Sequence, residues 1–250
     1  MTNKTWEHFW LNEGWTVWLE RKIVSRIEGD DRIFDFRAIG GWESLKESVA
    51  QVPENYSRLV PTLGDDDPDE AYSSVPYEKG FCLLHCLEKR VGKERFGHFA
   101  KAYLESFKFV TCTSEEFRAF VNEYFKGEPL IESFDWDTWL YKGGMPIEDP
   151  GFDRSLTNSA EDLANAWMTY DANEIDVPDV SISTWSTGLV LCFLDTLLSN
   201  LDAKEKSLSV STIAEMEGMY RMSSSGNSEI LLRWCKLCIK SGKSVDCSLQ

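Results

Sequence analysis

The sequence predicts an all-α protein, and three observations support this fold class. Apolar residues recur at the i, i+3, i+4, i+7 spacing along most of the chain, which is typical of amphipathic helices. Helix-start signals precede several of these segments, and strand signals are weak everywhere. The 250 residues, 42% of them hydrophobic, are enough for one or two globular domains.

The first part of the chain, residues 1–142, is expected to form one domain. Ser74 and Pro76 have the positions of an N-cap and a first-turn proline. Thr113 with Glu116 forms a capping box, and Asp135 caps a short helix that carries two tryptophans. A polar loop with an acidic run separates the early helices from the later ones. The expected helices are 5–21, 42–51, 74–90, 93–107, 113–125 and 136–140, with the loop at 53–71.

A linker and a second helical domain are expected to follow. Residues 143–151 contain three glycines and two prolines, so we place a linker at 143–155. Beyond it, helices are expected at 159–170, 184–201, 211–222 and 228–239. Residues 156–250 would then stack antiparallel helix pairs as a small solenoid.

The first expected helix carries a glutamate in apolar surroundings. Trp6, Phe9, Trp10, Glu13 and Val17 would share one stripe of a helix over 5–21. A carboxylate there costs on the order of 3–5 kcal/mol unless a cation meets it, and no Lys or Arg lies one turn away on that face. A bound metal ion would satisfy Glu13. The alternative is a protonated or distantly paired core glutamate.

The residues of this helix add a family resemblance. Residues 2–21, with Asn12-Glu13-Gly14, resemble the third-ligand helix of the leukotriene A4 hydrolase/aminopeptidase group of thermolysin-like zinc aminopeptidases. The motif of that family is His-Glu-x-x-His, an eighteen-residue spacer, then the glutamate. The resemblance implies that Glu13 is a ligand of a Zn²⁺ cofactor. It also implies the C-terminal part of a thermolysin-like catalytic domain, followed by a helical, armadillo-like domain.

The rest of the family's metal motif is absent from this sequence. The three histidines, His8, His85 and His98, form no His-Glu-x-x-His pair, and the position of the second motif histidine would precede Met1. The Gly-x-Met-Glu-Asn segment, which holds the substrate's amino terminus in the family, is missing too. We therefore expect a fragment shortened at both ends, whose isolated form does not hold catalytic zinc.

A second motif resembles the family at residues 67–80. Tyr77 falls in the first turn of the helix predicted after Ser74, where a phenol can donate to a developing oxyanion. The resemblance assigns this catalytic role to Tyr77, and a cap or surface tyrosine is the alternative. The implied substrate-binding residues are Tyr72, Asp69, Trp6, Phe9 and Pro68. Asp69 is equally compatible with a solvated loop carboxylate, and Trp6, Phe9 and Pro68 with plain core.

The resemblance implies a zinc aminopeptidase that acts on peptide amino termini, with a lipid epoxide as a further substrate. Trp15 stands where leukotriene A4 hydrolase has a histidine, so the peptidase activity is favoured over the epoxide hydrolase activity. The alternative is a catalytically inactive short form that acts as a helical interaction module. The sequence does not predict an oligomeric state.

Composition excludes other classes of protein. A formal net charge of −16 argues against nucleic acid and anionic membranes as partners, and no window is apolar enough to span a membrane. Seven cysteines without framework spacing indicate reduced thiols and a cytoplasmic location. Core packing is the preferred interpretation of Cys82, His85 and Cys86, and also of the Cys235-x-x-Cys238 pair.

Overall fold

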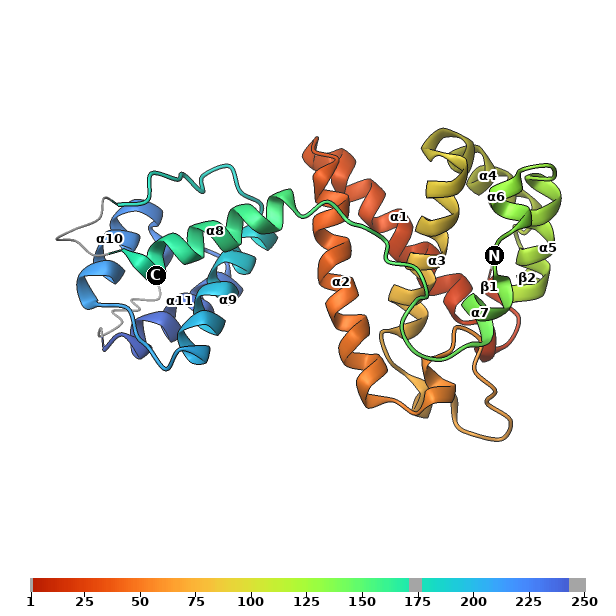
Figure 1. Cartoon of the computed structure of the whole chain (residues 1–250), viewed down its shortest axis with the longest axis horizontal. Coiled ribbons are helices and arrows are strands. Elements are labelled where there is room, and N and C mark those ends of the chain that lie inside the picture. The colour runs from red at the N-terminus through yellow and green to blue at the C-terminus, as the bar shows by residue number, and fades with distance from the viewer. Residues whose placement is uncertain (1, 171–176, 243–250) are drawn as a thin grey trace. The chain divides into compact units, whose positions relative to one another are not determined.

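The computed structural model describes residues 2–170 and 177–242, and the chain divides into two compact units, Met1–Asp153 and Arg154–Gln250 (Figure 1). Helices form both units, which confirms the predicted all-α class. Among the described residues the only strands are β1 (Thr2–Asn3) and β2 (Thr111–Cys112), which pair in parallel. Within the same residues, no helix is both long and apolar enough to cross a bilayer.

The first unit contains seven α-helices and three short 3₁₀ turns among its described residues. Thr113 and Glu116 make both hydrogen bonds of the predicted capping box, and the Asp135 side chain accepts from the Thr138 N–H. The helices are α1 (Trp10–Glu28), α2 (Arg32–Gln51), α3 (Val75–Val91), α4 (Lys93–Ser106), α5 (Ser114–Tyr124), α6 (Pro129–Glu132) and α7 (Trp136–Tyr141). The turns are η1 (Trp6–His8), η2 (Glu54–Ser57) and η3 (Pro68–Ala71).

Aromatic side chains fill the core between α1, α3, α4 and α5. Trp15 lies at the centre, with ring centroids 5.9 Å from Phe96 and 5.4 Å from Tyr103, both stacked. Phe117 of α5 meets Trp15 and Trp10 edge-on. Rings at these separations add offset or edge contacts to the free energy gained by burying their large apolar area. Trp15 is thus a core residue.

Helices α1 and α3 pack directly on each other at two glycines. A Cβ added to Gly14 would lie 2.8 Å from the carbonyl carbon of Gly80, so no side chain fits between the two backbones. Further along, Arg21 of α1 donates from Nη2 to both carboxylate oxygens of Glu78 on α3, at 3.0 and 2.8 Å. The crossing is therefore set by backbone contact and held by a buried charge pair.

Helix α2 corrects the prediction of a helix limited to 42–51, because it runs without a break from Arg32 to Gln51. Gly40 and Gly41, which directly precede the predicted start, both lie inside the helix. A Cβ on Gly41 would collide with the side chains of Glu78 and Arg21. Gly41 is therefore required by the packing of α2 on the charge pair, and it does not end the helix.

The single helix predicted over 5–21 is also wrong at its start. Trp6 belongs to the 3₁₀ turn η1 and is 60% exposed, whereas α1 begins at Trp10, which is fully buried. The helical spacing therefore does not extend to Trp6. Glu13, inside α1, is half-buried at the edge of the core. The stripe predicted through Trp6, Glu13 and Val17 is not the buried face of α1.

The second unit contains four α-helices among its described residues: α8 (Ser155–Thr169), α9 (Thr187–Ala203), α10 (Val210–Tyr220) and α11 (Ser228–Lys240). Helix α9 packs against both α8 and α11. The indole of Trp167 is buried, and its N–H donates to the Tyr220 hydroxyl at 3.0 Å. The armadillo-like arrangement of these helices stays a prediction.

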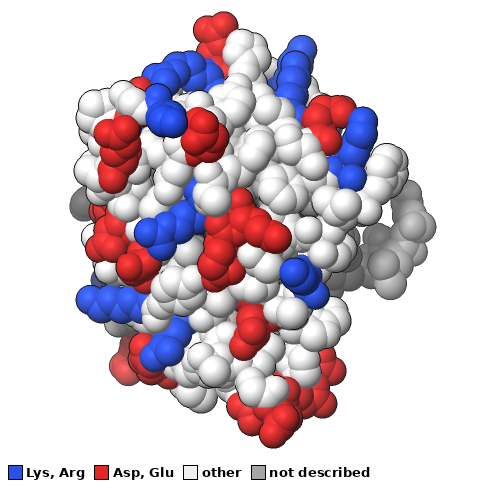
Figure 2. All heavy atoms as spheres, turned by 90° about the vertical axis from the view of Figure 1, so that its right-hand side faces the viewer, with Lys and Arg blue, Asp and Glu red and all other residues white. Residues whose placement is uncertain are grey.

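Acidic and basic side chains are interspersed on the face of the molecule shown in Figure 2. The net charge of −16 is therefore not expressed on this face as one continuous acidic surface. Mixed charge of this kind favours solubility over steering of one highly charged partner.

We expect Gly14→Ala to destabilise the first unit by about 1–3 kcal/mol, because the new methyl group would force α1 and α3 apart. Gly40→Ala is the matched control: Gly40 is also helical, and a Cβ there meets nothing within 4 Å. That change should stabilise the helix by about 0.5–1 kcal/mol. Urea unfolding followed by tryptophan fluorescence measures both, and equal effects would contradict the proposed backbone contact.

Candidate active site

A cavity of about 270 Å³ opens where η1, η3 and the start of α3 meet. Five of the residues that the sequence assigned to substrate binding line it: Trp6, Phe9, Pro68, Asp69 and Tyr72. These residues come from two segments about sixty positions apart, which the crossing of α1 and α3 brings together. The cavity is thus formed by the fold of the first unit and not by one local motif.

Tyr77 lies beside this cavity, in the first turn of α3, as predicted. Its ring meets Phe9 edge-on at a centroid distance of 6.0 Å and Tyr72 at 6.3 Å. Burial, the phenol of Tyr72 and the negative charge of Glu13 raise the pKa of Tyr77 to about 12. The hydroxyl therefore keeps its proton at neutral pH and is available as a hydrogen-bond donor.

Glu13 faces Tyr77 from the first turn of α1, next to the crossing glycine Gly14. Its side chain is half-buried, and burial raises the pKa of its carboxyl group. Within residues 2–170 and 177–242 the Glu13 carboxylate makes no hydrogen bond and no ion pair. A carboxylate without a partner at the edge of a core has the chemistry of a zinc ligand.

Glu13 is a single candidate ligand. No group of three or more His, Cys, Asp or Glu side chains that could hold a metal ion occurs in the part of the chain that the structure describes. The residues present thus fit one oxygen ligand of a zinc site and do not form a complete set.

The mouth of the cavity is open to solvent. Tyr72 is 70% exposed, and Asp69 is an exposed residue of η3. The Asp67 side chain accepts the Asp69 N–H at 3.1 Å, which fixes the turn and leaves the Asp69 carboxylate at the cavity rim. Asp69 and Tyr72 can therefore contact a ligand that enters from solvent.

The opposite wall, segment 56–63, was missed by the sequence analysis. Tyr56, Arg58, Leu59, Pro61 and Leu63 all line the cavity. The Tyr56 hydroxyl donates to Asp66 at 2.8 Å, and Arg58 pairs with Glu54 at 2.7 Å. Tyr56, Leu59, Val60 and Leu63 stand at helical spacing, but Pro61 interrupts a helix there, so the apolar content of this loop was the available signal.

The Cys82, His85 and Cys86 cluster on α3 packs against aromatic and charged neighbours. Cys82 is buried in the core, and the His85 ring stacks on Phe81 with a centroid distance of 5.7 Å. The Cys86 thiol donates to Glu148 at 3.1 Å, and burial raises its pKa to about 12. These contacts describe core packing and a protonated thiol.

Comparison with known families gives two matches that together cover most of the chain. The family described as peptidase family M1 domain matches residues 1–139, and the one described as leukotriene A4 hydrolase, C-terminal, matches residues 185–248. The first of these ranges contains Glu13, Tyr77 and the whole cavity.

Individual proteins agree with these family matches. Leukotriene A-4 hydrolase of Xenopus laevis is 38% identical over 97% of this chain, and leucine aminopeptidase 2 of Emericella nidulans is 36% identical over 98%. The structure of native leukotriene A4 hydrolase from Saccharomyces cerevisiae superimposes with a TM-score of 0.84 at 33% identity, covering 96% of this chain.

The chain spans about 40% of the length of these relatives and 41% of the yeast structure. Because the first family match extends over 139 of 250 residues, the chain belongs to peptidase family M1, with leukotriene A4 hydrolase and leucine aminopeptidase 2 as homologues along its whole length.

Proposed function

We propose that this chain supplies part of the active site of a zinc-dependent aminopeptidase that removes the amino-terminal residue of peptides. The observation that carries the proposal is that Tyr77 contacts Phe9 and Tyr72 of the cavity wall and lies close enough to Glu13 for that carboxylate to raise its pKa. Membership of peptidase family M1 supports the same reaction class. The described residues hold no complete set of metal ligands, so the proposal requires further ligands and a general base from outside residues 2–170 and 177–242.

Each site residue then has a chemical role. Glu13 would hold Zn²⁺ through a carboxylate oxygen, and bound zinc would supply Lewis-acid activation of water and of the scissile carbonyl. Tyr77 would donate its proton-bearing hydroxyl to the oxygen that becomes negative during attack. Its raised pKa keeps that donor intact across the neutral range. Asp69 and Tyr72 would orient the substrate at the rim.

Peptide amino termini are the proposed substrates, since the carboxylates of Glu7 and Asp69 line the cavity and most of its other lining residues are apolar or aromatic. Trp6, Phe9 and Pro68 would contact the apolar part of a ligand. A lipid epoxide is a second substrate class, because relatives of this chain are leukotriene A4 hydrolases. A cytoplasmic location is also part of the proposal, and it rests on the cysteine pattern alone.

An alternative function is that of a catalytically inactive interaction module. Leu19, Ile23 and Ile27 are spaced by four residues on α1, and all three are exposed, Ile27 by 78%. An apolar helical face open to solvent is typical of a surface that packs on another polypeptide. This function applies if the 250-residue chain acts alone, since its described residues hold no cluster of three or more candidate metal ligands.

We expect the isolated chain, supplied with zinc, to hydrolyse neither arginyl nor alanyl reporter substrates. A chimera that joins the preceding part of yeast leukotriene A4 hydrolase to this chain should hydrolyse them. In the chimera, Glu13→Gln should lower both zinc content and kcat/KM, the latter at least ~100-fold, because a metal ligand is lost.

Glu20→Gln is the control for that substitution, because Glu20 lies on the same helix and pairs with Arg37 at the surface. It should leave zinc content and activity unchanged. Turnover by the isolated chain, or full activity of Glu13→Gln in the chimera, would contradict the assigned role of Glu13.

Tyr77→Phe in the same chimera should lower kcat about 10²–10³-fold with little change in KM, because one hydrogen bond to the transition state is removed. Tyr124→Phe is the control, because it also removes a tyrosine hydroxyl, but from the exposed surface of α5. It should change neither kcat nor KM. Steady-state kinetics separate the two parameters. An effect of Tyr77→Phe on KM alone would indicate a substrate-binding role.

The raised pKa of Tyr77 also predicts a pH dependence of stability. The folded pKa of about 12 lies above the ordinary value of 10, so the folded state holds this proton more tightly. The resulting stability is present in full below pH 10 and is lost as the pH rises toward 12. Between about pH 9 and 11, the free energy of unfolding should fall more steeply for the wild-type chain than for Tyr77→Phe. Parallel slopes in urea titrations would contradict this.

A further inference from the structure

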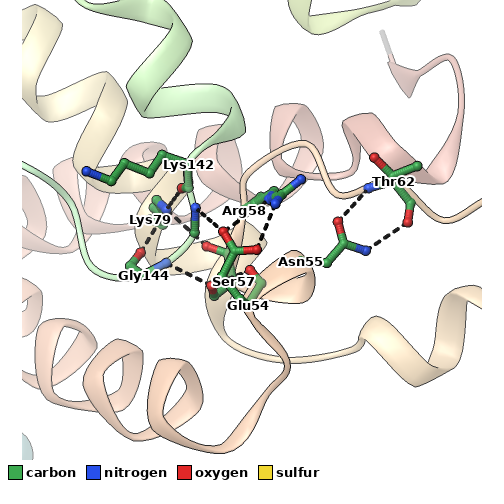
Figure 3. Close-up of polar contacts among 9 residues, drawn as sticks. Glu54, Asn55, Ser57, Arg58, Thr62, Lys79, Lys142 and Gly144 are labelled. Carbon is green, nitrogen blue, oxygen red and sulfur yellow. Dashed lines mark hydrogen bonds and ion pairs between the residues drawn. The ribbon is translucent and has the colours of Figure 1, made fainter.

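Lys79 is a charged side chain buried in the first unit, and the proposed chemistry does not use it. It lies on α3, two residues after Tyr77, and only 1% of its surface is exposed. Its Nζ donates to the backbone carbonyls of Ser57 at 3.0 Å, Lys142 at 2.9 Å and Gly144 at 2.8 Å (Figure 3). All three N–H groups of the ammonium therefore have acceptors.

The cost of burying this charge argues for a specific role. Burial lowers the pKa of Lys79 to about 8, and the nearest carboxylate that opposes the shift is that of the exposed Glu54. A buried ammonium without a close ion-pair partner is retained only where carbonyl oxygens replace its hydration. An apolar side chain of similar length would fill the space but leave three buried carbonyls unsatisfied.

The three acceptors come from two segments that touch each other. The Gly144 N–H donates to the Ser57 hydroxyl at 2.8 Å, and the Gly143 N–H donates to Glu54 at 3.2 Å. A Cβ on Gly143 would lie 2.5 Å from the Glu54 carbonyl oxygen, so the two backbones are in contact there. Lys79 thus fastens segment 142–144 and η2 to helix α3 at a single point (Figure 3).

Segment 56–63, the cavity wall, continues directly from this point. Its middle is held by the Val60 N–H donating to Leu140 at 2.9 Å, and its far end by the Leu63 N–H donating to Glu7 at 3.1 Å. The near end is held through Ser57, Glu54 and Lys79, and the Tyr56 hydroxyl also donates to Asp66 in the following loop. Of these contacts, those of Lys79 reach α3, so its release would free the near end of the wall from the helix of Tyr77.

We propose that Lys79 is a positioning residue: its ammonium holds the cavity wall, residues 56–63, at a fixed distance from Tyr77. The link to substrate binding rests on the proposed function of the cavity, whereas the mechanical link between Lys79 and the wall does not. The tests below measure the mechanical link, so they succeed or fail independently of any peptidase activity.

Residue-resolved amide hydrogen exchange on the 250-residue chain tests the proposal with Lys79→Met. Exchange should accelerate at least ~10-fold at the amides of Val60, Leu63, Gly143 and Gly144, because the free energy of local opening falls there. Amides in the middle of α5 (Ser114–Tyr124) should keep their rates. Lys142→Met is the matched control, since it removes an exposed ammonium but leaves the Lys142 carbonyl acceptor. It should change none of these rates.

Unchanged exchange in the wall of Lys79→Met would overturn the proposal. Equal acceleration in the wall and in α5 would also overturn it, because a residue that only adds global stability has that effect. If Lys79→Met does not fold, Gly143→Ala provides the second test, since its methyl group would push segment 142–144 away from Glu54. It should accelerate exchange in the wall and leave α5 unchanged. A wall that exchanges at the wild-type rate in Gly143→Ala would contradict the proposal.

Discussion

The contact between Gly14 and Gly80 is the constraint on which the rest of the first unit depends. Each glycine belongs to a motif that also carries a candidate active-site residue, Glu13 beside Gly14 and Tyr77 one turn before Gly80. Where two helix backbones touch, their separation is set by atoms that have no rotamers. The backbone positions of Glu13 and Tyr77 relative to each other are therefore set by this contact, a form of preorganisation that the proposed catalysis would use.

The same crossing organises the interior behind the site. The Arg21–Glu78 pair bridges α1 and α3, two turns after Gly14 on α1 and two residues before Gly80 on α3. Helix α2 covers the pair so closely that only a glycine fits at position 41. On the other side, Trp15 stacks between α4 residues and joins them to α1. The charge pair thus joins α1 to α3, the ring packing joins α1 to α4, and neither group can shift without loss of buried contacts.

Local signals predicted the parts of this fold that local interactions form. The Thr113 capping box and the Asp135 cap are contacts within three residues, and both are present as expected. The parts predicted wrongly depend on distant neighbours. The helix predicted at 42–51 begins earlier, and Gly41 inside it is required by the Arg21–Glu78 pair, which the local sequence does not show. The cavity wall at 56–63 was missed for the same reason, because it is held in place by hydrogen bonds to Leu140 and Glu7, which are distant in sequence. The roles of Glu13 and Tyr77 were assigned from the family resemblance, because the spacing alone favoured a core glutamate at position 13.

The contacts of Lys79 also set the order in which the chain can complete the cavity. Lys79 reaches back 22 residues to Ser57 and forward 65 residues to Gly144, and the Gly144 N–H reaches back 87 residues to Ser57. Contacts over such separations form late, after the helices, because closing a long loop costs entropy before the contact can contribute favourable free energy. During synthesis, Glu13 and Tyr77 can meet once α3 has emerged, whereas the wall beside them waits for residue 144 to leave the ribosome.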